Sequence, residues 1–94
     1  MTVYEVSVPR PKDAGMTKVK LLVSMSYGQG GGDAYTCPIG QGVHTVSFPV
    51  YGNCEPLDAT NYLNGRNFSV KIRFEKDGGE EEVDVTSTVR KVTR

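Results

Sequence analysis

The chain has 94 residues, of which 37% are hydrophobic and 23% charged, with 11 basic side chains against 11 acidic ones. This length favours a single domain over residues 1–94 and excludes a multidomain protein. The balanced charge argues against bulk binding to nucleic acid, and no apolar run approaches the ~20 residues of a membrane-spanning helix. No charged segment followed by an apolar one opens the chain, so a secreted product would already have lost its signal.

The first part of the chain alternates apolar and polar residues in two segments separated by a loop. Residues 2–8 alternate and predict a strand, whereas residues 9–15 contain two prolines and a glycine and predict a loop. Residues 17–27 give the longest alternation in the chain. One face of this segment carries Val19, Leu21, Val23, Met25 and Tyr27. Because the opposite face is polar except for Leu22, we expect a half-buried strand at the centre of a sheet.

The stretch from residue 36 to residue 50 joins a cysteine, a glycine-rich turn and another alternating strand. Residues 28–33, ahead of it, predict a flexible connection long enough to carry the chain from one sheet to another. Pro38 holds Cys37 extended, and the glycines that follow let the backbone turn. Pro49 cannot donate to a ladder, so it predicts a sheet edge or a bulge. The apolar face of this strand carries Val46, Phe48 and Val50.

The last part of the chain predicts a β-hairpin. Residues 51–66 are rich in turn formers and have room for at most one helical turn. Residues 67–76 alternate again, the Asp77-Gly78-Gly79 turn reverses the chain, and residues 81–92 return beside them. The inward face of the first of these strands carries Phe68, Val70, Ile72 and Phe74. Since each strand has one apolar face, we predict an all-β, antiparallel, immunoglobulin-like β-sandwich of six to seven strands.

The two cysteines, Cys37 and Cys54, bracket one strand and its flanking turns. A disulfide between them would close a loop of about 17 residues and stabilise the fold by about 3 kcal/mol. Such a bond would place the protein in an oxidising compartment and favours a secreted or extracellular protein. The alternative is a pair of buried free thiols in a cytosolic protein.

Residues that carry catalysis or bind metals are few. His44 is the only histidine, and no nucleophile motif accompanies it. Together with the two cysteines it makes three soft ligands, short of a closed zinc site. The carboxylates of residues 75–84 match no calcium loop and are more typical of a charged hairpin tip. The sequence therefore indicates a protein that is not an enzyme and that has no cofactor or metal.

Asn67-Phe68-Ser69 is an acceptor triplet for N-glycosylation, and the alternation places Asn67 and Ser69 on the outward face. Basic side chains share that outer face, but no aromatic residue is interleaved with them for stacking on bases, so we do not expect a nucleic-acid partner. These basic residues are Lys18, Lys20, Lys71 and Arg73.

From residue 35 onward the order of features resembles the ML lipid-recognition domain family, which includes the mite group 2 allergens and the lysosomal sterol-transfer proteins. The similar segments are Cys37-Pro38-Ile39 with Gly42, the strand that ends in Phe48-Pro49-Val50, and residues 68–74 followed by Asp77-Gly78. Residues 17–23 resemble the family strand that precedes the cysteine-proline motif.

The resemblance implies two splayed sheets that hold a lipid or sterol, or another apolar small molecule, between them. The residues that would contact this ligand are Leu21, Val23, Met25, Phe48, Val50, Phe68, Val70 and Ile72. In any other sandwich the same side chains fill a dry core. Two alternatives remain: a glycan-binding or cell-surface module, and an assembly subunit of virion or pilus type that pairs with a protein partner. The glycan module would use exposed tyrosines, namely Tyr27, Tyr35, Tyr51 and Tyr62.

Overall fold

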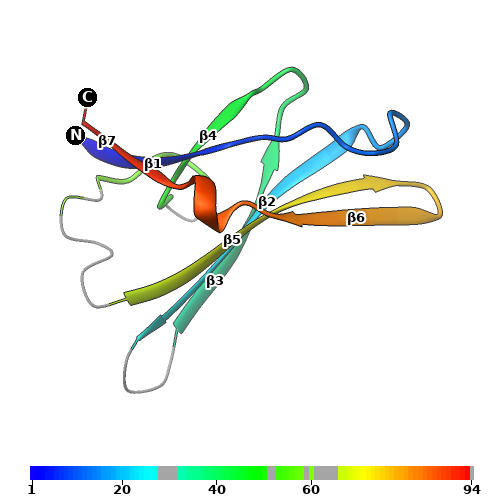
Figure 1. Cartoon of the computed structure of the whole chain (residues 1–94). Helices are drawn as coiled ribbons and strands as arrows, with labels where there is room; N and C mark the ends of the chain where they lie inside the picture. Colours follow the sequence, from blue (N-terminus) through cyan, green and yellow to red (C-terminus); the bar gives the residue numbers. More distant parts are fainter. Residues whose placement is uncertain (28–31, 51–52, 59, 61–65, 94) are drawn as a thin grey trace.

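The computed structural model of the chain describes residues 1–27, 32–50, 53–58, 60 and 66–93. These residues form two antiparallel sheets, one with the strand order β4-β1-β7 and one with the order β3-β2-β5-β6 (Figure 1). The strands are β1 (Thr2–Ser7), β2 (Lys18–Tyr27), β3 (Gly32–Ile39), β4 (Thr45–Phe48), β5 (Arg66–Lys76), β6 (Gly79–Asp84) and β7 (Arg90–Thr93), and η1 (Thr86–Thr88) is a single 3-10 turn. The predicted all-β, antiparallel sandwich is confirmed, whereas the immunoglobulin-like topology stays a prediction.

Strand β2 lies in the middle of the four-stranded sheet, as its long alternation predicts. Leu21 pairs with Cys37 of β3 on one side and with Ile72 of β5 on the other. Leu21, Val23 and Ile72 are each at most 2% exposed, whereas Ser24 and Lys71 on the opposite face are exposed. One face of this sheet therefore belongs to the core and the other faces solvent.

The connection through residues 28–33 does not change sheets, contrary to our expectation. Strands β2 and β3 are antiparallel neighbours whose pairing runs to Ser26 opposite Gly32, so the chain makes a hairpin here. A short connection suits antiparallel neighbours, and a glycine-rich sequence does not by itself distinguish a hairpin from a crossover. Gly32 also needs to be a glycine, since a Cβ there would lie 2.2 Å from the carbonyl oxygen of Met25.

The predicted return strand over residues 81–92 is wrong in its second half. Strand β6 pairs with β5 only as far as Asp84, and the chain then crosses through η1 so that β7 pairs with β1. Thr86 explains the break: its Oγ1 accepts a hydrogen bond from the Val70 N–H at 2.9 Å. The Thr86 N–H in turn donates to Asp84 Oδ1 at 2.9 Å. Because a side chain takes the place of the next ladder partner, the chain leaves the sheet.

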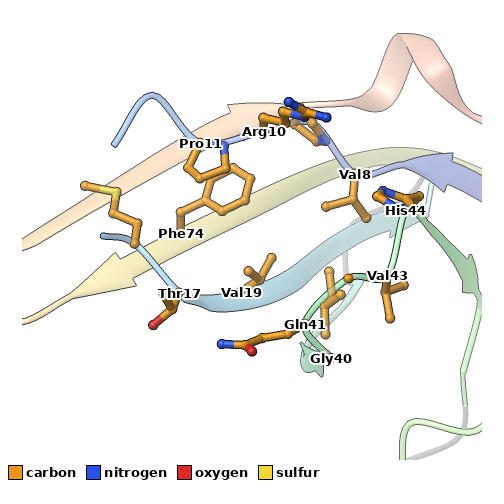
Figure 2. Close-up of a pocket in the computed structure, with 14 residues that line it drawn as sticks. Val8, Arg10, Pro11, Thr17, Val19, Gly40, Gln41, Val43, His44 and Phe74 are labelled. Carbon is orange, nitrogen blue, oxygen red and sulfur yellow. The ribbon is translucent and has the colours of Figure 1, made fainter. Parts of the chain in front are cut away.

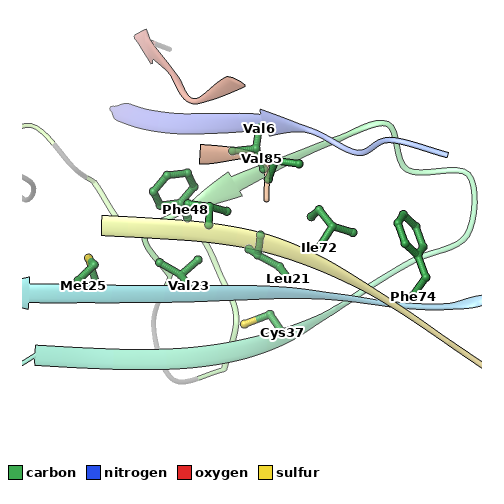
Figure 3. Close-up of a cluster of buried hydrophobic side chains, with 10 residues drawn as sticks. Val6, Leu21, Val23, Met25, Cys37, Phe48, Ile72, Phe74 and Val85 are labelled. Atoms are coloured by element: carbon green, nitrogen blue, oxygen red, sulfur yellow. The ribbon is translucent and has the colours of Figure 1, made fainter. Parts of the chain in front are cut away.

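The core lies where the two sheets overlap, and Figure 3 shows its side chains converging between the strands. Phe48 is 0% exposed and lies on β4, an edge strand followed by Pro49, as that proline predicts. The buried members of the core are Val6, Leu21, Val23, Met25, Cys37, Phe48, Val70, Ile72, Phe74 and Val85. A disulfide joins Cys37 to Cys54, so the predicted pairing is confirmed.

Strand β1 is buried on both faces, which its alternation did not indicate. Val3 is 0% exposed and Glu5 is 5% exposed, although both lie on the face opposite to Val6. The Glu5 carboxylate accepts a hydrogen bond from the Arg90 guanidinium of β7 at 3.2 Å. A buried carboxylate needs such a partner, so β7 both extends this sheet and compensates the charge of its central strand.

The turn-rich segment over residues 51–66 is described only at residues 53–58 and 60, so the expected limit of one helical turn lies partly outside the described residues. In the described part, Pro56 forms an isolated bridge with Val50, and the Leu57 N–H donates to the Pro49 carbonyl at 3.0 Å. The segment therefore continues along the edge of β4. Within the described residues, no helix is long and apolar enough to cross a membrane.

Candidate functional site

The two sheets differ in length, and this difference leaves one end of the interior open. Strands β2 and β5 have 10 and 11 residues, whereas β1 and β4 have 6 and 4. The β1–β4 pairing reaches Ser7 opposite Thr45 at this end. The hairpin of β5 and β6 extends past that point (Figure 1). Val19 and Phe74 thus lie on a part of the longer sheet that no strand of the shorter sheet covers.

A pocket of about 250 Å³ occupies this end (Figure 2). Its walls come from the overhanging sheet, from the loop after β1 and from the turn between β3 and β4. The lining is mostly apolar and includes Val8, Met16, Val19, Ile39, Val43 and Phe74. Phe74 forms the floor and is 1% exposed, whereas Val43 at the mouth is 38% exposed. An apolar group that entered here would therefore exchange water for hydrocarbon contacts on several sides.

Hydrogen bonds from the backbone hold the turn that forms one wall of the pocket. The Val8 N–H donates to the His44 carbonyl at 2.8 Å, which ties the end of β1 to the turn. Gly42 has a φ of 77°, a conformation that favours glycine, and it allows the chain to reverse between β3 and β4. The wall is thus set by main-chain geometry rather than by the packing of long side chains.

The opposite wall is the loop over residues 9–16, which is fastened to the β5–β6 hairpin. The Lys12 N–H donates to Glu81 Oε2 at 3.1 Å, and the Lys76 ammonium pairs with the Asp13 carboxylate. The hydrogen bond from Lys76, followed by one from the Gly15 N–H, holds the pKa of Asp13 below its ordinary value. Polar contacts at the tip of the loop therefore hold it over Phe74.

The rim of the pocket carries positive and neutral polar groups. Arg10 and His44 lie on the same side of the mouth, next to Val8 (Figure 2). Both side chains are exposed, and within the described part of the chain neither forms an ion pair. No carboxylate is among the described residues that line this pocket. The rim therefore favours an anionic or neutral polar group over a cationic one.

The eight predicted ligand contacts lie together, but in the closed middle of the sandwich. Six of them are at most 2% exposed, and Val50 and Phe68 are partly buried against the same cluster. Phe48 packs on Phe68 with ring centroids 6.0 Å apart. Leu21 and Val50 also border a second opening of about 220 Å³ beside the disulfide. A ligand role for these residues stays a prediction, and the end pocket brings in others that we did not expect, including Val8, Met16 and Val43.

The other predicted site residues are placed as follows. Asn67 is exposed on the outer face of β5, and His44 is exposed as expected. Tyr35 lies partly buried against the core, so the expectation that it is exposed is wrong. The reason is its register: it pairs with Val23 and shares that residue's inward face. The side chain of Tyr27 and the whole of Tyr51 and Tyr62 lie outside the described residues.

Two of the four basic side chains on the outer face are paired with carboxylates. Lys20 lies 3.2 Å from Glu75, and Arg73 lies 3.3 Å from Glu82. Within the described residues, no group of three or more histidine, cysteine or acidic side chains is arranged to hold a metal ion. The described carboxylates near the hairpin thus pair with Lys20 and Arg73 instead of converging on a cation.

Comparisons with models of protein families, with curated proteins and with solved structures find no match to this chain.

Proposed function

We propose that this protein is a non-enzymatic binding module that holds the apolar part of a small amphiphile, such as a lipid, in the pocket at the open end of its sandwich. The observation that carries this proposal is the mostly apolar pocket between the overhanging sheet and the loop over residues 9–16. Ligand sites are commonly concave and apolar with a few polar groups at the mouth, which describes this pocket. The resemblance to the ML family is a separate argument in the same direction and itself stays a prediction.

The size of the pocket limits what can enter it. A volume of about 250 Å³ exceeds the ~150 Å³ of a cavity that binds benzene, but lies below the ~300–1,000 Å³ typical of sites for drug-sized ligands. We therefore favour a single acyl chain or one aromatic ring over a whole sterol. A sterol would require the packed middle around Phe48 and Ile72 to open.

The rim supports an amphiphile with a negative or neutral head group. Arg10 and His44 would face the head group while Val19 and Phe74 contact the tail. His44 has no carboxylate beside it in the lining of the pocket to orient it as a base, which supports binding rather than catalysis. The Cys37–Cys54 disulfide fits an oxidising environment and supports a secreted or extracellular protein.

The two alternatives have less support. A glycan platform of tyrosines loses Tyr35, which faces the core. Assembly through strand edges is disfavoured by charge and by proline, since β6 carries Glu80 and Glu82 and β4 is followed by Pro49. Two of the four edge strands among the described residues, β4 and β6, thus have features that discourage pairing with another chain.

A titration followed by amide chemical shifts tests the proposal, with decanoate and decanol as probes. Both should shift the amides of Val8, Val19, Ile39 and Phe74, and decanoate should bind the more tightly. Val43→Trp, which fills the mouth, should abolish these shifts, whereas Ser87→Trp on the exposed 3-10 turn should preserve them. Arg10→Gln should remove the preference for decanoate. If neither probe shifts these amides, or if the shifts fall on the outer sheet face, the proposal is wrong.

A further inference from the structure

We propose that Asn67 carries an N-linked glycan and that its first sugars lie in a hollow on the outer face of the four-stranded sheet. The sugar would come from an oligosaccharide linked to a lipid diphosphate: a C–N bond forms to the Asn67 amide nitrogen, which loses a proton, and the lipid diphosphate leaves. Asn67 heads the only Asn-X-Ser/Thr triplet in the sequence. It is exposed on β5, and Ser69 follows on the same face of the strand. The acceptor and its hydroxyl residue thus both lie on the solvent side of the sheet, on the face away from the core and the pocket.

The side chains around Asn67 leave room for a sugar. The register places Ser26 opposite Asn67 and Ser24 opposite Ser69, and the next strand contributes Gly32 and Ala34. Neighbours across a sheet have Cβ atoms about 5 Å apart, so large side chains at these positions would crowd the acceptor. Among the described residues, none of these four neighbours is larger than serine, and Ser69 on the same strand is also small.

A hollow of about 490 Å³ begins at Ser24 and Ser69 and extends to Leu22 and Thr36. Among the side chains that the structure describes on this face, Leu22 is the one large apolar residue, and it interrupts the polar side of β2. It is half-buried and can contact the C–H surface of a sugar or the methyl of an acetamido group. Without a sugar in the hollow, water would contact the exposed part of the Leu22 side chain.

The glycan would also cover an edge of the sheet. Strand β6 pairs with β5 only from Lys71 onward, and Val70 bonds to Thr86 and Val85. Before Val70, β5 has β2 on one side and no strand on the other among the described residues. A bulky hydrophilic group at Asn67 would hinder another chain from pairing there. The disulfide fits the secretory compartment in which such groups are attached.

The first test is to secrete the chain from cultured insect cells behind an added signal sequence and to measure the intact mass of the soluble protein. We expect one glycan, lost on treatment with an amidase that removes N-glycans. Asn67→Gln and Ser69→Ala should each abolish it, whereas Ser69→Thr, which preserves the triplet, should retain it. Secreted wild-type protein without the added mass would overturn the proposal, and would leave the ligand pocket untouched.

The second test asks whether the sugar packs in the hollow. Enzymatic removal of the glycan should lower the midpoint of thermal unfolding by about 4 °C, a shift that a small domain shows for a modest loss of contacts. Because the enzyme leaves an aspartate, Asn67→Asp should unfold at the same temperature as the treated protein. Ser24→Arg fills the hollow and should erase the drop, whereas Ser87→Arg should not. An equal midpoint with and without sugar in the wild type, or an unchanged drop in Ser24→Arg, would show that the glycan does not lie there.

Discussion

The middle of the sandwich and its open end are built from the same two strands, β2 and β5, with the same alternation. In the middle, Leu21 and Ile72 meet side chains of the shorter sheet and are at most 2% exposed. At the end, Val19 and Phe74 point in the same direction but meet a loop and a turn, which leave a pocket of about 250 Å³. The difference shows that an inward-facing residue becomes core or pocket lining according to whether the opposing sheet is long enough to cover it.

The largest contrast should come from deleting one phenylalanine ring in each region. Phe48→Ala should destabilise the protein by about 3–5 kcal/mol, because the ring is enclosed by both sheets. Phe74→Ala should cost less, about 2 kcal/mol, because the loop over residues 9–16 can settle into the space. Urea denaturation of the two variants measures both values. Equal costs would mean that the open end is packed as rigidly as the middle.

Removal of the disulfide should lower the stability of the whole fold and leave binding in the pocket unchanged. It links β3 to the segment after β4, beside the closed middle. Cys37→Ala combined with Cys54→Ala should lower the free energy of unfolding by about 3 kcal/mol, the value expected for a loop of this length. Decanoate should still shift the amides of Val19 and Phe74 at temperatures where the variant is folded. A loss of binding by folded protein would show that the two regions are not independent.

One substitution made at two positions of the same strand sharpens the comparison. Val23→Phe adds volume in the closed middle and should cost about 1–3 kcal/mol through overpacking. Val19→Phe places the same ring on the same face but in the pocket, and should change stability by less than about 1 kcal/mol while blocking decanoate. Thermal unfolding measures the change in stability of each variant, and titration with decanoate measures whether the pocket still binds. A large loss of stability at Val19 would contradict an open end.

The smallest expected effect is a pH dependence of the loop over residues 9–16, which forms one wall of the pocket. The pKa of Asp13 is held below its ordinary value of 3.8 by the hydrogen bonds from Lys76 and the Gly15 N–H. Because the folded-state pKa is the lower one, these contacts stabilise the loop fully above the ordinary pKa of 3.8. This stabilisation is lost as the pH falls from there through the folded-state pKa. The protection of the Gly15 and Met16 amides, measured as the exchange rate relative to the intrinsic rate at each pH, should therefore fall in acid while that of Leu21 does not.

The control for this acid effect is Asp13→Asn, which cannot ionise. Its loop amides should show low protection at every pH, with no further loss of protection in acid. If the wild-type loop stays protected well below pH 3.8, the contact between Asp13 and Lys76 does not fasten the loop.

The strands could be predicted from the sequence wherever one face meets core and the other meets water. Residues 67–76 alternate for that reason, residues 18–27 do so except at Leu22, and Pro49 indicated an edge or a bulge, of which the edge is observed. The break at Thr86 could not be predicted, because a threonine that caps a ladder looks like any outward residue of a strand. Val3 and Glu5 were missed because the alternation of β1 does not report that its second face is covered as well.

The candidate site was harder to predict than the fold. Alternation identifies Val19 and Phe74 as inward-facing, yet it does not report the length of the strands that lie opposite. The pocket depends on β1 ending at Ser7 and on a loop that reaches Glu81, a contact between residues 69 apart in the sequence. Met16 and Val43 belong to loops without periodicity, so the sequence contains no local signal for their role.

Xenon binding tests most directly whether the interior is filled in the middle and open at one end, since small apolar atoms enter dry cavities. Methyl spectra under xenon pressure should show the largest shifts at Val8, Val19 and Val43, and negligible shifts at Val23 and Val70. Shifts centred on Val23 and Val70, or no response from the three pocket valines, would contradict this account.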